Sequence, residues 1–262
     1  MGHGLGWIAD VVDERDEAFS LSKLSLGEVK SSHSMRNFVV EMLNQGALPS
    51  CVAQAVPQGI RVVEYRKSGR VPPLTSRFFT WYYARLQHGD QNNATGTYIR
   101  TAVKVLNALG RPPEQQWPHV LTDVNIQPPR RPTYAKRPPP RVSMCAYDHR
   151  KVQYHRITET GTDRKYAVKA ALSAGMPVVF GTDVGYSFLE DEGPARNIAP
   201  PIAESIAGGH AMLATGFDEE GVEDCNSWGT DWRDLGFAHL SWDYICWEGT
   251  RDLWAFSLPE AA

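Results

Sequence analysis

The chain contains the stretch Gln45-Gly46-Ala47-Leu48-Pro49-Ser50-Cys51, in which an amide side chain precedes a thiol by six positions. Two distant stretches, Gly208-Gly209-His210-Ala211 and Asn226-Ser227-Trp228-Gly229, add an imidazole and a second amide. A thiol nucleophile needs a base to take its proton, a group that orients the base, and a donor that stabilises the oxyanion. The residues that offer these roles, in that order, are Cys51, His210, Asn226 and Gln45.

The order and spacing of these groups resemble those of papain-like cysteine proteases. His210 and Asn226 follow Cys51 by 159 and 175 positions, slightly more than the roughly 130 to 150 positions usual in the family. The run from Asn226 to Phe237 is similar to the family sequence Asn-Ser-Trp-Gly-x-x-Trp-Gly-x-x-Gly-Tyr. The resemblance implies a cysteine endopeptidase that forms a thioester acyl-enzyme and uses no cofactor.

The loop before the cysteine departs from the family signature C-G-[SA]-C-[WY]. It reads Leu48-Pro49-Ser50-Cys51-Val52, so the first cysteine, the glycine and the aromatic residue are all replaced. Pro49 also removes a backbone donor and fixes its own φ. These changes alter the loop and the edges of the cleft, but they keep the reacting atoms.

The resemblance also implies a role for each residue of the site. His210 would deprotonate Cys51, Asn226 would orient the imidazole through its amide oxygen, and Gln45 would bind the oxyanion together with the backbone N–H of Cys51. Seven residues would contact substrate: Gly96, Thr97, Ile99, Gly208, Gly209, Ala211 and Trp228. Since Ile99, Gly208 and Ala211 would surround the main specificity pocket, we expect that pocket to be apolar, although Asp183 or Glu204 could approach it.

Helical periodicity appears first directly after the loop. Val52, Val56, Gly59 and Val63 recur at helical spacing, which predicts a helix that begins at Cys51 with Ser50 as its cap. The N-terminal end of that helix would favour the thiolate. Pro57 predicts a kink or an interruption, because proline removes a helical hydrogen bond. Further helices are expected over 76–87, 98–109 and 163–174.

Short apolar runs over 176–180, 211–217 and 237–240 predict strands in the second half. We therefore expect an α+β, papain-like fold with two lobes, one helical and one β-rich, and the active site in the cleft between them. The expected organisation is an N-terminal extension (1–35), a mainly helical lobe (36–127), a stiff Pro/Arg-rich connection (128–141) and a β-rich lobe (142–262). A proline-rich docking motif is the alternative for the connection.

Composition and charge limit the expected partners. Of the 262 residues, 42% are hydrophobic and 22% charged, which is ordinary globular composition. The formal net charge of −3 gives no reason to expect nucleic-acid or anionic-membrane partners. The partners that remain are a peptide or protein substrate and, as a further candidate, a protein inhibitor.

The cysteines and histidines predict neither a metal site nor a disulfide framework. Beside Cys51 there are Cys145, Cys225 and Cys246, an odd number without a CxxC pair, and the histidines form no HExxH pattern. We expect these three thiols to be free and buried, as most free cysteines are.

The first residues are rich in charge, which is incompatible with the apolar core of a secretory signal: the acidic ones are Asp10, Asp13, Glu14, Asp16 and Glu17. We therefore expect a cytoplasmic protein, or one packaged in a particle. Only 44 residues precede Gln45, which we interpret as too few for the long inhibitory propeptide of papain-like zymogens. The protein is accordingly expected to be active without processing.

Two other classes of function remain open at this point. Another thiol acyl transferase, such as a transglutaminase-like enzyme or a cell-wall peptide hydrolase, uses the same Cys/His chemistry. A catalytically silent binding or structural protein that kept the fold would explain the altered Leu48, Pro49 and Val52. Gln45 and the Asn-Ser-Trp-Gly run argue against the first class. The intact set Gln45, Cys51, His210 and Asn226 argues against the second.

Overall fold

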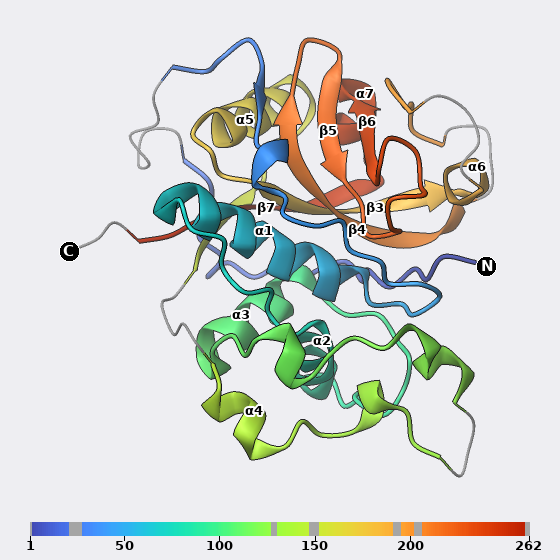
Figure 1. Ribbon diagram of the computed structural model, residues 1–262. Helices are drawn as coiled ribbons and strands as arrows, with labels where there is room; N and C mark the ends of the chain where they lie inside the picture. Colours follow the sequence, from blue (N-terminus) through green and yellow to red (C-terminus); the bar gives the residue numbers. More distant parts are fainter. Residues whose placement is uncertain are drawn as a thin grey trace.

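The computed structural model describes residues 2–20, 28–126, 130–146, 152–190, 195–201 and 206–259, which form two lobes (Figure 1). The helical lobe contains α1 (Cys51–Ser68), α2 (Arg77–Leu86), α3 (Ile99–Leu109) and α4 (Pro140–Met144), with the 3₁₀ turns η2 (Glu114–Gln116), η3 (Leu121–Asn125) and η4 (Thr133–Ala135). The other lobe is built on an antiparallel sheet. The predicted α+β, two-lobed class is confirmed.

The strands of this sheet, among the described residues, are β1 (His33–Ser34), β2 (Gln153–Ile157), β3 (Val178–Gly185), β4 (Ile206–Phe217), β5 (Gly221–Cys225), β6 (Phe237–Ser241) and β7 (Thr250–Ser257). Their order is β2-β7-β3-β4-β5-β6, and β1 pairs with β4. The lobe also holds η1 (Arg36–Phe38), α5 (Gly161–Ser173), α6 (Tyr186–Leu189) and α7 (Trp242–Cys246). The three strands expected from the sequence lie within or overlap β3, β4 and β6.

The helix α1 runs through the middle of the molecule, between the other helices and the sheet (Figure 1). It is one uninterrupted helix from Cys51 to Ser68, so the predicted interruption at Pro57 is wrong. Its residues 51–64 are all buried. Packing on every side stabilises α1 enough to offset the hydrogen bond that the proline removes.

The N-caps of α1 and α2 differ, and only the first was predicted from the sequence. Ser50 occupies the N-cap position of α1, but its side chain does not cap the helix. Its Oγ instead accepts a hydrogen bond from Gln54 Nε2 at 3.0 Å. At α2 the Oγ of Ser76 does accept the backbone N–H of Phe79, at 3.1 Å, which is the usual N-cap contact.

The proline-rich segment is only partly extended. Residues 128 and 129 lie outside the described part of the chain, and the residues that follow form η4 and α4. The ring of Tyr134 packs against Trp81, with centroids 5.2 Å apart, and its carbonyl accepts a hydrogen bond from Arg85 at 2.7 Å. Because α4 also lies beside the helices (Figure 1), we place the boundary between the lobes after α4.

The thiols outside the cleft are less buried than expected. Cys225 is buried, but Cys246 is partly exposed and Cys145 is exposed. Cys145 directly follows the short helix α4, at the surface of the helical lobe. In the described part of the chain, no helix is both long enough and apolar enough to cross a membrane.

Candidate active site

Cys51 is the first residue of α1, at the helix N-terminus as predicted. Its side chain is fully buried, and burial raises the pKa of the thiol to about 11. Backbone N–H groups of Ala211 and Gly6 act in the opposite direction, but their effect is smaller. The expected thiolate is therefore not the stable form in this conformation, because loss of hydration outweighs the helix dipole.

His210 and Asn226 meet where β4 and the end of β5 lie side by side. The distance from His210 Nε2 to Asn226 Oδ1 is 2.8 Å. The backbone N–H of Ser227 donates to the same Oδ1 at 2.7 Å, so the amide orientation is fixed and Nε2 must carry the proton. The other ring nitrogen, Nδ1, is then bare, buried and without a hydrogen-bond partner among the described residues, as a general base requires.

The environment of His210 keeps it neutral. Burial lowers the pKa of the imidazole to about 4, although the hydrogen bond with Asn226 partly offsets this. The indole ring of Trp228 stacks on the imidazole, with centroids 4.6 Å apart. Trp228 therefore covers the His210–Asn226 pair.

Gln45 is held rigidly from three sides. Its backbone N–H donates to Ser227 O at 2.9 Å, and its Oε1 accepts from Ser227 Oγ at 2.6 Å. Its Nε2 donates to Leu48 O and to Gly4 O, both at 2.8 Å. The proposed oxyanion donor thus already holds a backbone carbonyl, which belongs to the N-terminal segment.

That segment, residues 3–10, lies in the cleft between the lobes and forms hydrogen bonds with both of them (Figure 1). Trp7 N donates to Gly209 O at 3.1 Å, on β4. Thr97 N donates to Gly6 O at 2.9 Å and Ile8 N donates to Thr97 O at 3.1 Å, just before α3. From the small number of residues before Gln45 we expected a protein that is active without processing, and this stays a prediction. We did not expect the structure's strand-like segment, which covers Cys51 with only a few residues.

Alternating glycines allow the segment to lie this close to the nucleophile loop. A Cβ on Gly4 would lie 2.2 Å from Leu48 O, and a Cβ on Gly6 would lie 2.0 Å from Pro49 O. Both distances are far below van der Waals contact with backbone atoms that cannot easily move. The repeated glycine at positions 2, 4 and 6 was the available sequence signal, and the sequence analysis did not use it.

Comparisons with known proteins agree with this geometry. No family model matches the sequence. A protein of Acanthamoeba polyphaga mimivirus, described as an uncharacterized peptidase C1-like protein, is 26% identical over 283 residues, which is 97% of this chain and 86% of the viral protein. Xylellain, a cysteine protease from Xylella fastidiosa, superposes with a TM-score of 0.86 at 27% identity, over 99% of this chain and 97% of xylellain. The chain is a papain-like cysteine protease.

More distant solved structures share the fold of the protease. Bromelain from Ananas comosus, in complex with the E64 inhibitor, superposes with a TM-score of 0.65 at 18% identity, covering 88% of this chain and all of bromelain. Digestive procathepsin L 3 of Tenebrio molitor gives 0.71 at 14% identity, covering 98% of this chain and 76% of the procathepsin.

The predicted substrate contacts of the protease lie where the segment lies. Gly96 approaches Gly6 so closely that a Cβ there would be 2.3 Å from Gly6 O, and Gly208 faces the side chain of Leu5. The ring of His3 stacks on Trp228 at 4.3 Å. Ile99 and Ala211 are buried, at the start of α3 and on β4.

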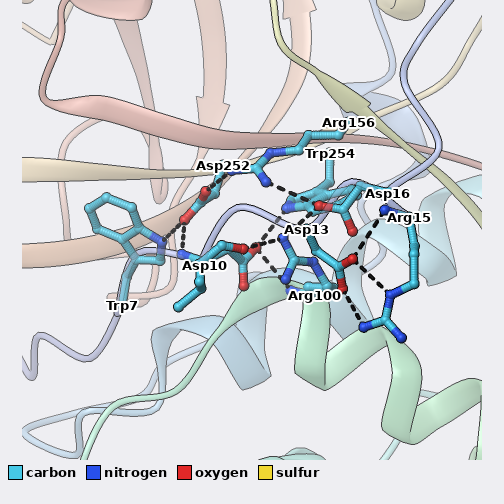
Figure 2. Close-up of polar contacts among 10 residues, drawn as sticks. Trp7, Asp10, Asp13, Arg15, Asp16, Arg100, Arg156, Asp252 and Trp254 are labelled. Atoms are coloured by element: carbon cyan, nitrogen blue, oxygen red, sulfur yellow. Dashed lines mark hydrogen bonds and ion pairs between the residues drawn. The ribbon is translucent and has the colours of Figure 1, made fainter.

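The acidic group beside the cleft is not one that the sequence analysis proposed. Glu204 lies outside the described residues, and Asp183 pairs with Arg251 at 3.2 Å. Asp252 instead accepts the indole N–H of Trp7 at 3.2 Å and the backbone N–H of Asp10 at 2.6 Å (Figure 2). No periodic pattern or motif marks Asp252, which comes near Trp7 only through folding.

Charged residues anchor the chain just after the segment (Figure 2). Asp16 pairs with Arg100 at 2.6 Å and with Arg156 at 3.0 Å, and Arg156 also pairs with Asp252 at 2.9 Å. Because Arg100 is on α3 and Arg156 is on β2, these contacts bind the chain that follows the segment to both lobes.

One group of possible metal ligands lies outside this site. Asp218, Glu220 and His239 place ligand atoms within 4.8 Å of one another. Arg196 already pairs with both carboxylates, at 2.9 and 3.1 Å. We assign no metal to this group.

Proposed function

We propose that the protease cleaves peptide bonds with Cys51 as nucleophile, His210 as general base, Asn226 as the group that orients the base, and Gln45 as oxyanion donor. The observation that carries this proposal is the 2.8 Å hydrogen bond between His210 and Asn226, which leaves Nδ1 bare. A catalytically silent protein has no need of that tautomer.

The mechanism follows from these groups. Nδ1 of His210 takes the proton of the Cys51 thiol, and the thiolate attacks the carbonyl carbon of the peptide bond. Gln45 Nε2 and the backbone N–H of Cys51 stabilise the oxyanion. The imidazolium then gives its proton to the leaving amine, and a thioester remains. A water molecule, deprotonated by His210, attacks the thioester and releases the carboxylic acid and the thiol.

We also propose that the N-terminal segment keeps the protease latent. The backbone N–H of Gly6 faces the sulfur of Cys51. The segment therefore covers the proposed nucleophile with a hydrogen-bond donor. Substrate has to displace it, and displacement hydrates Cys51 and His210 and moves the pKa of both groups back toward their ordinary values.

Hydrolysis of a general peptide mixture by the full-length chain tests the proposal. The Gly6→Ala variant is used because its Cβ is incompatible with the closed segment. We expect hydrolysis by Gly6→Ala, inhibition of it by the epoxide E64, and no hydrolysis by Gly6→Ala with Cys51→Ala. An opened protein that is folded, as judged by circular dichroism, but cleaves no peptide would support the silent alternative.

A further inference from the structure

The indole ring of Trp7 fills a recess in the wall of the β-rich lobe. A Cβ on Gly181 would lie 1.9 Å from Trp7 Cε2, and a Cβ on Gly209 would lie 2.9 Å from Trp7 Cε3. Only 6% of Trp7 is exposed. The recess therefore exists because β3 and β4 both lack a side chain at these positions, and its size matches an aromatic double ring.

A carboxylate lies at the end of this recess. Asp252 Oδ2 accepts two hydrogen bonds, from Trp7 Nε1 at 3.2 Å and from Asp10 N at 2.6 Å, and both donors belong to the N-terminal segment (Figure 2). Asp252 has a φ of 51°, which is rare for a non-glycine residue in a strand. It lies where the register between β3 and β7 shifts. Such strain persists where the surrounding structure enforces it, often at binding sites.

Two arginine side chains near the recess disfavour a further positive charge there. Arg156 Nη2 lies 2.9 Å from the other oxygen of Asp252. The guanidinium carbon of Arg251 lies 5.1 Å from the centroid of the Trp7 ring. The recess therefore favours a neutral aromatic side chain with a donor over an arginine or lysine side chain.

We propose that the recess is a side-chain specificity site that selects tryptophan in substrates, with Asp252 as the residue that recognises the indole N–H. This inference rests on the proposed function and names its substrate class. When the segment leaves, Asp252 Oδ2 loses both donors and is hydrated, and a side chain that refills the recess without a donor would bury this acceptor unpaired, which is unfavourable. A substrate tryptophan restores one donor, a phenylalanine restores none, and an arginine brings its charge beside Arg156 and Arg251.

The first test needs no catalysis. In full-length Trp7→Ala, indole should bind the vacated recess at least about 10-fold more tightly than benzofuran, which has the same shape without the N–H, as expected for a hydrogen bond to a charged acceptor. Adding Asp252→Asn should reduce this ratio to about 3-fold or less, whereas adding Asp218→Asn on another part of the lobe should leave it unchanged. Equal affinities for indole and benzofuran in Trp7→Ala, or no binding of either by calorimetry, would overturn the inference.

A second variant covers the case in which Asp252→Asn does not fold. Gly181→Ala in the Trp7→Ala chain places a methyl group in the recess and should abolish indole binding. If indole still binds with unchanged affinity, it binds elsewhere, and the recess is not its binding site.

The last test measures cleavage. A peptide library that scans each residue before the scissile bond is digested with the full-length chain carrying both Gly6→Ala, which opens the cleft, and Trp7→Ala. One position should prefer tryptophan to phenylalanine and to arginine by about 10-fold, and Asp252→Asn should remove the preference. Cleavage with phenylalanine or arginine equal to tryptophan at every position would refute the inference. If indole binds as expected but no peptide is cleaved, the recess is retained and the proposed function fails.

Discussion

Cys51 and His210 form a neutral pair in the closed conformation. Burial raises the pKa of the thiol to about 11 and lowers that of the imidazole to about 4, so proton transfer from Cys51 to His210 is strongly unfavourable there. The two residues to which we assign the chemistry are thus kept unreactive by their burial. Their reactivity depends on access of water and substrate, not on the identity of the residues alone.

At Gln45 we predict a purely catalytic effect. In the Gly6→Ala chain, Gln45→Ala should lower kcat by about 10² to 10³, the usual cost of losing one oxyanion donor, with little change in KM. Gln58→Ala is the matched control, because its Nε2 donates to Glu41 O and not into the cleft. Steady-state kinetics on one peptide substrate measures both. An unchanged kcat in Gln45→Ala would assign the donor role to another group.

At the scale of single residues, the sequence predicted the site residues whose chemical role allows few residue types. Gln45, His210 and Asn226 all lie near Cys51 or one another, because motif spacing carries that information. Asp252 was missed, since it meets Trp7 across 245 positions and only through a register shift in β7. No local pattern encodes such a contact.

The N-terminal segment is the element that most changes the interpretation of the chain. It is short, has no regular secondary structure over most of its length, and binds mainly through its backbone. Backbone recognition of this kind needs close approach, and the glycines at positions 4 and 6 allow it. A side chain at either position should weaken the contact of the whole segment.

For this element we predict a difference between two glycines. Gly6→Ala should expose Cys51, because the added Cβ would lie 2.0 Å from Pro49 O, whereas a Cβ on Gly2 meets nothing within 4 Å. Iodoacetamide at neutral pH should therefore modify Cys145 first in the wild-type chain and in Gly2→Ala, since Cys145 is exposed and Cys51 is buried. In Gly6→Ala, Cys51 should react fastest. Mass spectrometry of the labelled peptides distinguishes the sites, and slow labelling of Cys51 in Gly6→Ala would contradict the closed-segment account.

The regular elements were easier to predict than this segment. α2, α3 and α5 begin and end within two residues of the expected bounds, because caps and apolar periodicity mark them locally. The interruption at Pro57 was wrong, because the stability of α1 comes from packing on all sides, which a one-dimensional pattern does not show. Residues 3–10 have no apolar periodicity, and the repeated glycine does not say which loop the segment contacts, so only tertiary structure reveals its path.

At the scale of the whole molecule, the segment joins the two lobes across the cleft. It is bound by Thr97 and Arg100 on the helical side and by Gly209 and Asp252 on the other side. The carboxyl group of Asp10 is buried where the segment contacts both lobes. Its Oδ2 accepts hydrogen bonds from Trp254 Nε1 at 3.0 Å and Arg100 N at 3.3 Å. Opening the cleft therefore exposes this carboxyl group to water, and the pKa of Asp10 differs between the closed and open forms.

The final prediction concerns how closure of the segment over the cleft depends on pH. Burial, and then the charge of Asp252, raise the pKa of Asp10 from 3.8 to about 6, so the closed form binds an extra proton between about pH 4 and 6. The Asp10 contribution thus favours closure at low pH and is lost as the pH rises through about 6. His210 acts in the opposite direction, because its lowered pKa makes protonation favour opening. A comparison of the wild-type chain with Asp10→Asn cancels that second effect.

Hydrogen exchange of the amides of Trp7 and Ile8 should be equal in both chains near pH 4 and should become faster in the wild type as the pH rises to 6, by up to about 100-fold. The exposed Glu14→Gln should show no such difference, and a constant ratio for Asp10→Asn across this range would exclude Asp10 as the group that links closure to pH.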